Sequence, residues 1–136
     1  MNLEYNDRQH REYLNMTDRI GREWLGVFQG DTEFYSAVYW DLLTGIWRQR
    51  NPVRKTEALK FMNSIKSAHT AGKYVEFAIG KGILIEDGNP DDARSKLVRL
   101  SGEMRDRLDA FFDQAVGEVR KSNNTIHVLG PSPEQP

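Results

Sequence analysis

The stretch Asn89–Ser101, NPDDARSKLVRLS, decides the fold because a turn, a strand and the start of a helix follow one another within it. Its first residues, one Asn, one Pro and two Asp, are typical of tight turns. From Lys96 to Leu100, charged and aliphatic side chains are interleaved, as in a strand with one buried face. Ser101 can then cap a helix, since its hydroxyl oxygen can accept a hydrogen bond from the first turn. An acidic turn therefore leads into a basic strand and directly on to a helix.

A second strand candidate, Ile83–Glu86, lies just before this turn, and residues 87–92 form a loop rich in Asp, Gly, Asn and Pro. The two strands and the loop predict a β-hairpin. Arg94 lies where the tip of the hairpin returns to its second strand. Asp92 comes two residues earlier, so its carboxylate can pair with Arg94 or can brace another basic side chain at the tip.

Two helices joined by a tight connection precede the hairpin. The first spans about Arg54–Met62, and the second follows Ser67, a good N-cap residue, and ends near Ile79 before a Gly-Lys-Gly stop. A short helix, a tight turn, a second helix and a hairpin together predict a winged helix-turn-helix. The second helix has an apolar inner face, made of Ala71, Tyr74, Val75 and Ala78.

The opposite face of this second helix is polar and suits duplex DNA, because an α-helix fits the major groove, where base edges carry a unique donor and acceptor pattern. Arg94 is expected in the flanking minor groove, where arginine is the preferred insert. His69 is either a DNA contact or a solvated surface residue. Lys55 and Lys60 are further candidates for phosphate contacts. The predicted DNA-binding residues are Arg54, Lys66, Ser67, His69, Thr70, Lys73, Arg94 and Lys96.

Gly72 lies in the middle of this polar helix, where glycine costs about 1 kcal/mol of helix stability relative to alanine. Close approach of the helix to DNA would explain a glycine at this position. Close packing against another helix would explain it equally well.

Long helices are predicted on both sides of this region. Residues 6–28 carry a broad apolar stripe, which needs a partner within the chain or in another subunit. Residues 32–49 form a second helix, with Asp31 as a plausible N-cap. A long helix follows Ser101 to about Lys121, and residues 122–136 resemble a tail, partly disordered, in which 125–129 can be ordered by contact. The chain thus divides into an N-terminal helix (1–30), a DNA-binding region (31–100), a C-terminal helix (101–121) and a tail (122–136).

The charge distribution supports an anionic partner for the middle of the chain. Residues 48–99 hold 11 Lys or Arg and 6 Asp or Glu, a balance of +5, while the remainder holds 8 and 14, a balance of −6. Ordinary charge scatter is the alternative explanation. The sequence contains no cysteine, which excludes disulfides and thiolate chemistry. No apolar run is long enough to span a bilayer and the N-terminus carries no apolar signal segment, so a cytoplasmic location is expected.

Two motifs resemble the MarR family of bacterial winged-helix regulators, and the resemblance covers about residues 32–120. SAHTAGKYV, Ser67–Val75, resembles that family's recognition-helix pattern. KGILIE followed by DDARSKLVRLS resembles its wing, in which an Asp-x-Arg pair precedes a strand and the next helix. Three features depart from the family: Lys55-Thr56 in place of a Ser/Thr cap, a longer turn in FMNSIKS, and a short C-terminal part.

The resemblance implies a homodimer, with N- and C-terminal helices interlocked and two wings on a pseudo-palindromic operator. It implies Arg94 as the minor-groove residue. It also implies a small phenolic or lipophilic effector, for which four aromatic residues are candidates, although aromatics at helical spacing are commonly core residues. These residues are Trp24, Phe28, Tyr35 and Tyr39.

The sequence therefore predicts a mainly α protein with a small β-hairpin wing (α+β). The expected function is sequence-specific binding of double-stranded DNA by a homodimeric transcriptional regulator, a repressor. The alternative is a winged-helix protein-interaction module without DNA binding, which the acidic flanks and the net charge of −1 support. No nucleophile–base arrangement indicates an enzyme, and three histidines without ligand-like spacing indicate neither a metal site nor a cofactor.

Overall fold

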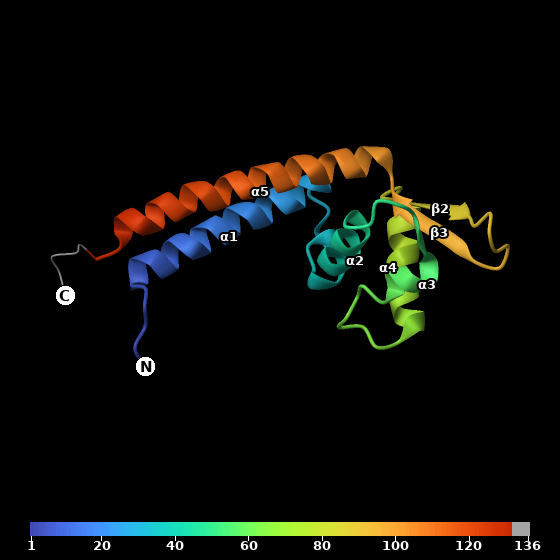
Figure 1. The fold of residues 1–136 in the computed structure, drawn as a ribbon, viewed down its shortest axis with the longest axis horizontal. Helices are drawn as coiled ribbons and strands as arrows, with labels where there is room; N and C mark the ends of the chain where they lie inside the picture. The colour runs from blue at the N-terminus through green and yellow to red at the C-terminus, as the bar shows by residue number, and fades with distance from the viewer. Residues whose placement is uncertain (132–136) are drawn as a thin grey trace. The chain divides into compact units, whose positions relative to one another are not determined.

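The computed structural model describes residues 1–131 (Figure 1) and confirms a mainly helical fold with a small antiparallel sheet. The sheet has three strands in the order β1-β3-β2. The elements in chain order are α1 (Asp7–Val27), a short 3-10 helix η1 (Thr32–Phe34), α2 (Ala37–Trp47), β1 (Val53–Arg54), α3 (Lys55–Leu59), α4 (Ala68–Gly80), β2 (Leu84–Gly88), β3 (Lys96–Leu100) and α5 (Gly102–Leu129).

The chain divides into two compact units. The helical unit contains residues 1–30 and the chain from Leu108 onward, and the winged unit contains Asp31–Arg107. In the helical unit, α1 begins with a capping box, in which Asn6 Oδ1 accepts from Gln9 N and Gln9 Oε1 accepts from Asn6 N, both at 2.9 Å. Trp24 packs edge-on against Phe28 and Phe111, with ring centroids 5.0 and 5.3 Å apart.

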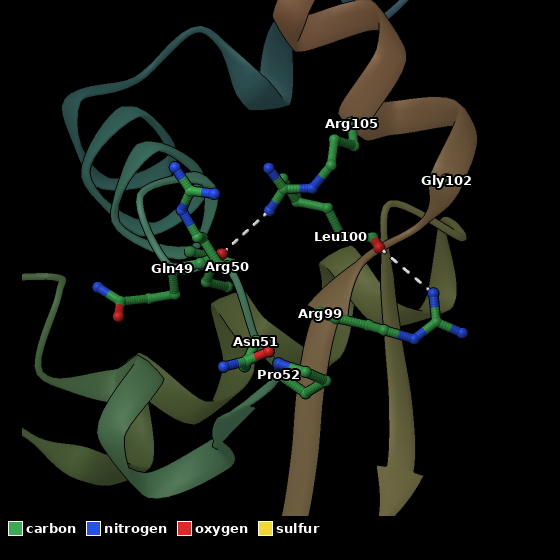
Figure 2. Close-up of a pocket in the computed structure, with 9 residues that line it drawn as sticks. Gln49, Arg50, Asn51, Pro52, Arg99, Leu100, Gly102 and Arg105 are labelled. Carbon is green, nitrogen blue, oxygen red and sulfur yellow. Dashed lines mark hydrogen bonds between the residues drawn. The ribbon is translucent and has the colours of Figure 1, made fainter.

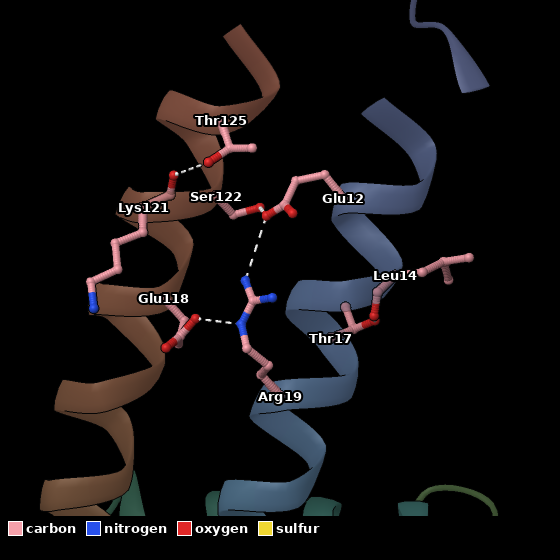
Figure 3. Close-up of polar contacts among 8 residues, drawn as sticks. All are labelled: Glu12, Leu14, Thr17, Arg19, Glu118, Lys121, Ser122 and Thr125. Atoms are coloured by element: carbon pink, nitrogen blue, oxygen red, sulfur yellow. Dashed lines mark hydrogen bonds and ion pairs between the residues drawn. The ribbon is translucent and has the colours of Figure 1, made fainter. Parts of the chain in front are cut away.

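A polar network joins α1 to α5 within the helical unit (Figure 3). Arg19 Nε donates to Glu118 Oε2 at 2.8 Å, and a terminal nitrogen of Arg19 lies 3.5 Å from Glu12 Oε2. The Ser122 hydroxyl, almost fully buried, donates to the same Glu12 oxygen at 2.8 Å. In these pairs the later residue of α1, Arg19, contacts the earlier residue of α5, Glu118, so the two helices are antiparallel. Side-chain pairs of this kind fix how far one helix is shifted along the other.

Helix α5 runs to Leu129, so the prediction that it ends near Lys121 is wrong. Residues 125–129 are ordered by contact, as expected, but as part of this helix. The segment SNNTIHVL has weak helix propensity, but tertiary contacts override it. Gln9 Nε2 donates to the Ile126 carbonyl at 2.9 Å, and Asn6 Nδ2 donates to the Leu129 carbonyl at 3.0 Å. These bonds satisfy carbonyls at the helix end that would otherwise lack partners. Residues 132–136, also assigned to the tail, lie outside the described residues.

The predicted helix at residues 32–49 is two elements in the winged unit. Asp31 caps the short η1, where its carboxylate accepts from Glu33 N at 3.1 Å. Ser36 then adopts an extended backbone and caps α2, with its hydroxyl accepting from Tyr39 N at 3.2 Å. Ser36 is thus a second N-cap residue inside the segment whose apolar pattern predicts one continuous helix.

The sheet contains the predicted hairpin and one further short strand. Strands β2 and β3 pair with Leu84 opposite Leu100 and Gly88 opposite Lys96. The two-residue β1 pairs with the other edge of β3, with Val53 opposite Val98. The predicted helix from Arg54 to Met62 is shortened accordingly, because Arg54 has extended backbone angles and α3 covers only Lys55–Leu59.

The core of the winged unit lies where α2, α3 and α4 meet the sheet. Gly45 on α2 allows this packing, because a Cβ at this position would lie 2.6 to 2.9 Å from atoms of the Phe61 side chain. The side chains that are fully buried include Leu42, Leu43, Met62, Val75, Leu84 and Val98.

Candidate nucleic-acid interface

Helix α4 has one buried face and one exposed face, as its sequence predicts. The Ser67 hydroxyl accepts from Thr70 N at 3.3 Å and caps the helix. Ala71, Val75 and Ala78 are buried in the winged unit. Burial of these three residues fixes the rotation of α4, so its remaining face points to solvent. The residues predicted to contact DNA on or before this helix are all exposed: Lys66, Ser67, His69, Thr70 and Lys73.

Gly72 lies on α4 with open space around it. A Cβ built at this position would meet no atom within 4 Å. Packing against another helix of the described chain therefore does not account for the glycine. A low, uncrowded surface remains between Ser67 and Lys73, where a partner molecule can approach the helix backbone closely.

Lys55 is bound within the protein, which contradicts its prediction as a phosphate contact. Its ammonium group pairs with Glu76 on α4 and donates to Glu86 Oε2 on β2 at 2.7 Å. Burial tends to lower the pKa of Lys55, but the hydrogen bonds that its ammonium group donates to the two carboxylates outweigh this effect and raise the pKa above its usual value of 10.5. Lys55 thus ties the first residue of α3 to α4 and to β2 of the hairpin. Lys60, the other candidate, pairs with Glu57 at 3.2 Å.

The wing tip is held by side-chain hydrogen bonds to the backbone. Asn89 Oδ1 accepts from Asp91 N at 3.0 Å, and Asn89 Nδ2 donates to the Ser95 hydroxyl at 2.8 Å. Asp92 Oδ1 accepts from the backbone N–H of Arg94 at 3.0 Å. Asp92 therefore shapes the turn before Arg94 and does not form an ion pair with its guanidinium, which corrects the side-chain pairing considered above.

Asn89 was predicted as one of four turn residues, but its particular role in the tip was not. Two of the hydrogen bonds that hold the tip belong to the Asn89 side chain. The signal was present, because asparagine readily accepts from a backbone N–H two residues ahead and so builds a turn by itself.

Of the seven cations predicted to meet DNA, five have no carboxylate partner among residues 1–131, whereas Lys55 and Lys60 form ion pairs. Lys81 and Arg99, also in the winged unit, form ion pairs as well. An exposed cation without an internal partner keeps its full charge available to a phosphate. The free and exposed cations of the predicted interface are Arg54, Lys66, Lys73, Arg94 and Lys96.

The four aromatic residues predicted to line an effector pocket lie in different environments. Trp24 and Phe28 are buried in the helical unit. In the winged unit Tyr39 packs against Phe34, and its hydroxyl donates to the Tyr74 carbonyl at 3.1 Å. Tyr35 is exposed. Three of the four therefore have roles in core packing, and their part in binding an effector stays a prediction.

Two solved structures that are similar to this chain are described as transcriptional regulators. The transcriptional regulator Tm0710 from Thermotoga maritima matches with a TM-score of 0.59 at 15% identity, over 88% of this chain and 81% of that one. Sco3205, a MarR family transcriptional regulator from Streptomyces coelicolor solved in complex with DNA, matches with a TM-score of 0.53 at 21% identity, over 91% and 74%. No protein-family model and no curated protein matches the sequence.

At these identities the comparison establishes the fold. The matches cover 88% and 91% of this chain. The chain therefore has the winged-helix fold of the MarR-type transcriptional regulators.

Proposed function

We propose that this protein is a sequence-specific, double-stranded DNA-binding transcriptional regulator. The observation that carries the proposal is a set of five exposed cations without carboxylate partners among residues 1–131: Lys66 and Lys73 before and on α4, Arg54 before α3, and Arg94 and Lys96 on the wing. Such a set attracts phosphates and loses affinity as salt concentration rises. The likeness in fold to a regulator solved with DNA supports the same conclusion.

In the proposed complex α4 enters the major groove and the wing reaches the adjacent minor groove. Ser67, His69 and Thr70 are proposed to contact base edges or phosphates, because they are exposed at the N-cap and in the first turn of α4. Lys73 supplies charge to the backbone, and Arg94 enters the minor groove from a tip that its own turn holds in shape. The remaining cations, Arg54, Lys66 and Lys96, are assigned to phosphates.

The protein is proposed to act as a homodimer on a pseudo-palindromic operator. The helical unit exposes large apolar side chains, among them Tyr13 and Leu14, each more than half exposed. A patch of exposed apolar side chains commonly marks a surface that binds a partner. These two residues and Tyr5 line a hollow of about 560 Å³ between α1 and α5. A second copy that covers this face would give the assembly two α4 helices and two wings, one for each half of a pseudo-palindromic operator. Binding over a promoter would then repress transcription.

Selection of DNA sequences from a random pool tests the function directly. We expect enrichment of an inverted repeat with half-sites about one helical turn apart, as a symmetric dimer requires. Recovery of no enriched sequence, together with retention of a partner protein by the same bead-bound chain, would favour the alternative of a protein-interaction module. Sedimentation at micromolar concentration tests the dimer separately, and a monomer there would contradict it.

A further inference from the structure

The wing is attached to the rest of the winged unit first at its base (Figure 2). Leu84 and Leu100 pair there, and both side chains are buried in the core. From Leu100 the chain continues into α5, where Arg105 donates to the carbonyl of Gln49, just after α2, at 3.2 Å. The base of the wing is therefore fixed to the body of the unit.

Toward the tip, the inner face of β2 loses its side chains. Side chains alternate along a strand, so Leu84, Glu86 and Gly88 belong to the same face of the sheet. Glu86 pairs with Val98, which is fully buried, so this face is the one packed against the helices. Because the next position on this face is a glycine, Glu86 is the last residue of β2 whose side chain can hold the wing against the helices.

Glu86 is held by Lys55, which follows β1 at the opposite edge of the sheet. The Lys55 ammonium group donates to Glu86 Oε2 at 2.7 Å and also donates to Glu76 on α4. Glu76 lies three residues after Lys73, so it shares the exposed face of α4 that is proposed to meet DNA. One ammonium group thus joins a point on the wing to a point on α4.

Beyond this contact the wing projects from the core, and Gly88 and Lys96 are exposed. Arg94 precedes Val98 by four residues, a span of about 14 Å in an extended chain. A rotation of the hairpin by about 15° at the Glu86–Val98 pair would move the backbone of Arg94 by roughly 4 Å at that distance. Such a shift exceeds the length of a hydrogen bond, so a small change at Glu86 decides whether Arg94 reaches its contact.

We propose that the contact of Lys55 with Glu76 and Glu86, here named the wing clamp, positions the wing against α4, so that Arg94 and α4 engage DNA together. Glu86 is the positioning residue of the wing, since it acts through the placement of Arg94 and touches no DNA itself. The effect of the wing clamp on DNA binding rests on the proposed function. The placement of the wing is a property of the free protein.

Glu86→Ala separates positioning from charge by the sign of its effect. Loss of a carboxylate makes the protein more positive, so charge alone would strengthen DNA binding. Loss of the wing clamp displaces Arg94, so we expect the dissociation constant for a selected DNA sequence to rise about fivefold or more in fluorescence anisotropy. Asp87→Ala is the matched control, because Asp87 lies on the opposite face of β2 and pairs with Arg99 inside the hairpin. Its dissociation constant should stay unchanged or fall, and tighter binding by Glu86→Ala would overturn the proposal.

Combined variants show whether the loss passes through the wing. Arg94→Ala should weaken binding about fivefold or more in wild type but less than about twofold in Glu86→Ala, because the wing of that variant no longer places Arg94. Lys73→Ala, on α4, should weaken both proteins by the same factor. Glu86→Gln keeps a neutral acceptor for Lys55, so it should fall between wild type and Glu86→Ala, and it carries the test if the alanine variant does not fold. Independent, multiplying losses from Glu86→Ala and Arg94→Ala would contradict positioning.

The position of the wing can also be measured without DNA. The sequence contains no cysteine, so spin labels attach only at Ala68→Cys on α4 and Ala93→Cys at the wing tip, two exposed positions. Pulsed electron resonance on labelled chains diluted with unlabelled ones should give a narrow distance distribution in wild type and Asp87→Ala, and a broader or shifted one in Glu86→Ala. The same distribution in all three proteins would overturn the proposal. If wild type binds no DNA, the proposed function fails, while this distance measurement still decides whether Glu86 positions the wing.

Discussion

Replacement of Lys55 by methionine should destabilise the winged unit. It should not remove a phosphate contact, because two carboxylates of the protein engage the Lys55 ammonium group. Lys55 is 27% exposed, and its partners Glu86 and Glu76 are 28% and 58% exposed. Removing one partner of a buried pair costs about 3 to 5 kcal/mol, whereas a fully exposed pair contributes about 0.2 to 1 kcal/mol. The intermediate exposure places the expected loss in the free energy of unfolding at about 1 to 2 kcal/mol. Methionine keeps most of the aliphatic part of the lysine side chain, so the decrease in the free energy of unfolding measures the contribution of the ammonium group.

Urea unfolding followed by circular dichroism measures this loss. Lys60→Met is the matched control, because Lys60 pairs with Glu57 on the same short helix but is 73% exposed, and its loss should stay below about 0.5 kcal/mol. Equal losses in the two variants would refute the reasoning. The raised pKa of Lys55 also predicts how the free energy of unfolding depends on pH. The ion pairs of Lys55 stabilise the fold at neutral pH, and this stabilisation is lost as pH rises through the folded-state pKa, which lies above 10.5. A difference between wild type and Lys55→Met that does not fall as pH rises through the folded-state pKa would contradict the ionic origin.

Three further substitutions test the packing and the exposed face of α4. Gly45→Ala should destabilise by about 1 to 3 kcal/mol in thermal unfolding despite better helix propensity, because the new Cβ meets Phe61; a gain in stability would contradict this packing. Tyr39→Phe should lose about 1 kcal/mol in urea unfolding, since the hydrogen bond to the Tyr74 carbonyl disappears, and an unchanged midpoint would show that this bond contributes nothing. Gly72→Ala should raise the melting temperature, because alanine favours the helix by about 1 kcal/mol and the Cβ has open space, while affinity for DNA falls. Unchanged DNA affinity would mean that α4 does not approach DNA closely at Gly72.

The hairpin and α4 were predictable because each carries several local signals that agree. Strand β3 has the predicted bounds, and Ser67 forms the predicted N-cap of α4. Turn residues, a capping serine and apolar periodicity all depend on neighbours in the chain, so a single sequence reveals them.

Other features depend on contacts between distant residues and were not predictable in this way. The extension of α5 to Leu129 rests on hydrogen bonds from Asn6 and Gln9, more than a hundred residues away in sequence. Strand β1 has two residues, too few for any periodic pattern, and exists because β3 offers a free edge. The engagement of Lys55 by two carboxylates required knowledge of how α3, α4 and β2 meet.

For the candidate interface, too, one part was predictable from the sequence and another part was not. Its residue types and exposed positions followed from the pattern of α4 and the wing, and the absence of carboxylate partners could be seen only in the folded chain. The role of Asp92 shows the difference. A spacing of two residues to Arg94 suggested a side-chain pair, whereas the geometry favours a bond to the backbone N–H of Arg94.

The salt dependence of DNA binding by wild type and Arg94→Ala tests the central claim most directly. Fluorescence anisotropy with a selected DNA sequence would give the dissociation constant between low and moderate salt. We predict a steep linear fall of log affinity with log salt, as several phosphate contacts require. Arg94→Ala should weaken binding by about 1 to 3 kcal/mol, at an unchanged melting temperature, because Arg94 has no carboxylate partner in the described chain. Affinity that is insensitive to salt and equal for the two proteins would contradict DNA recognition by this wing.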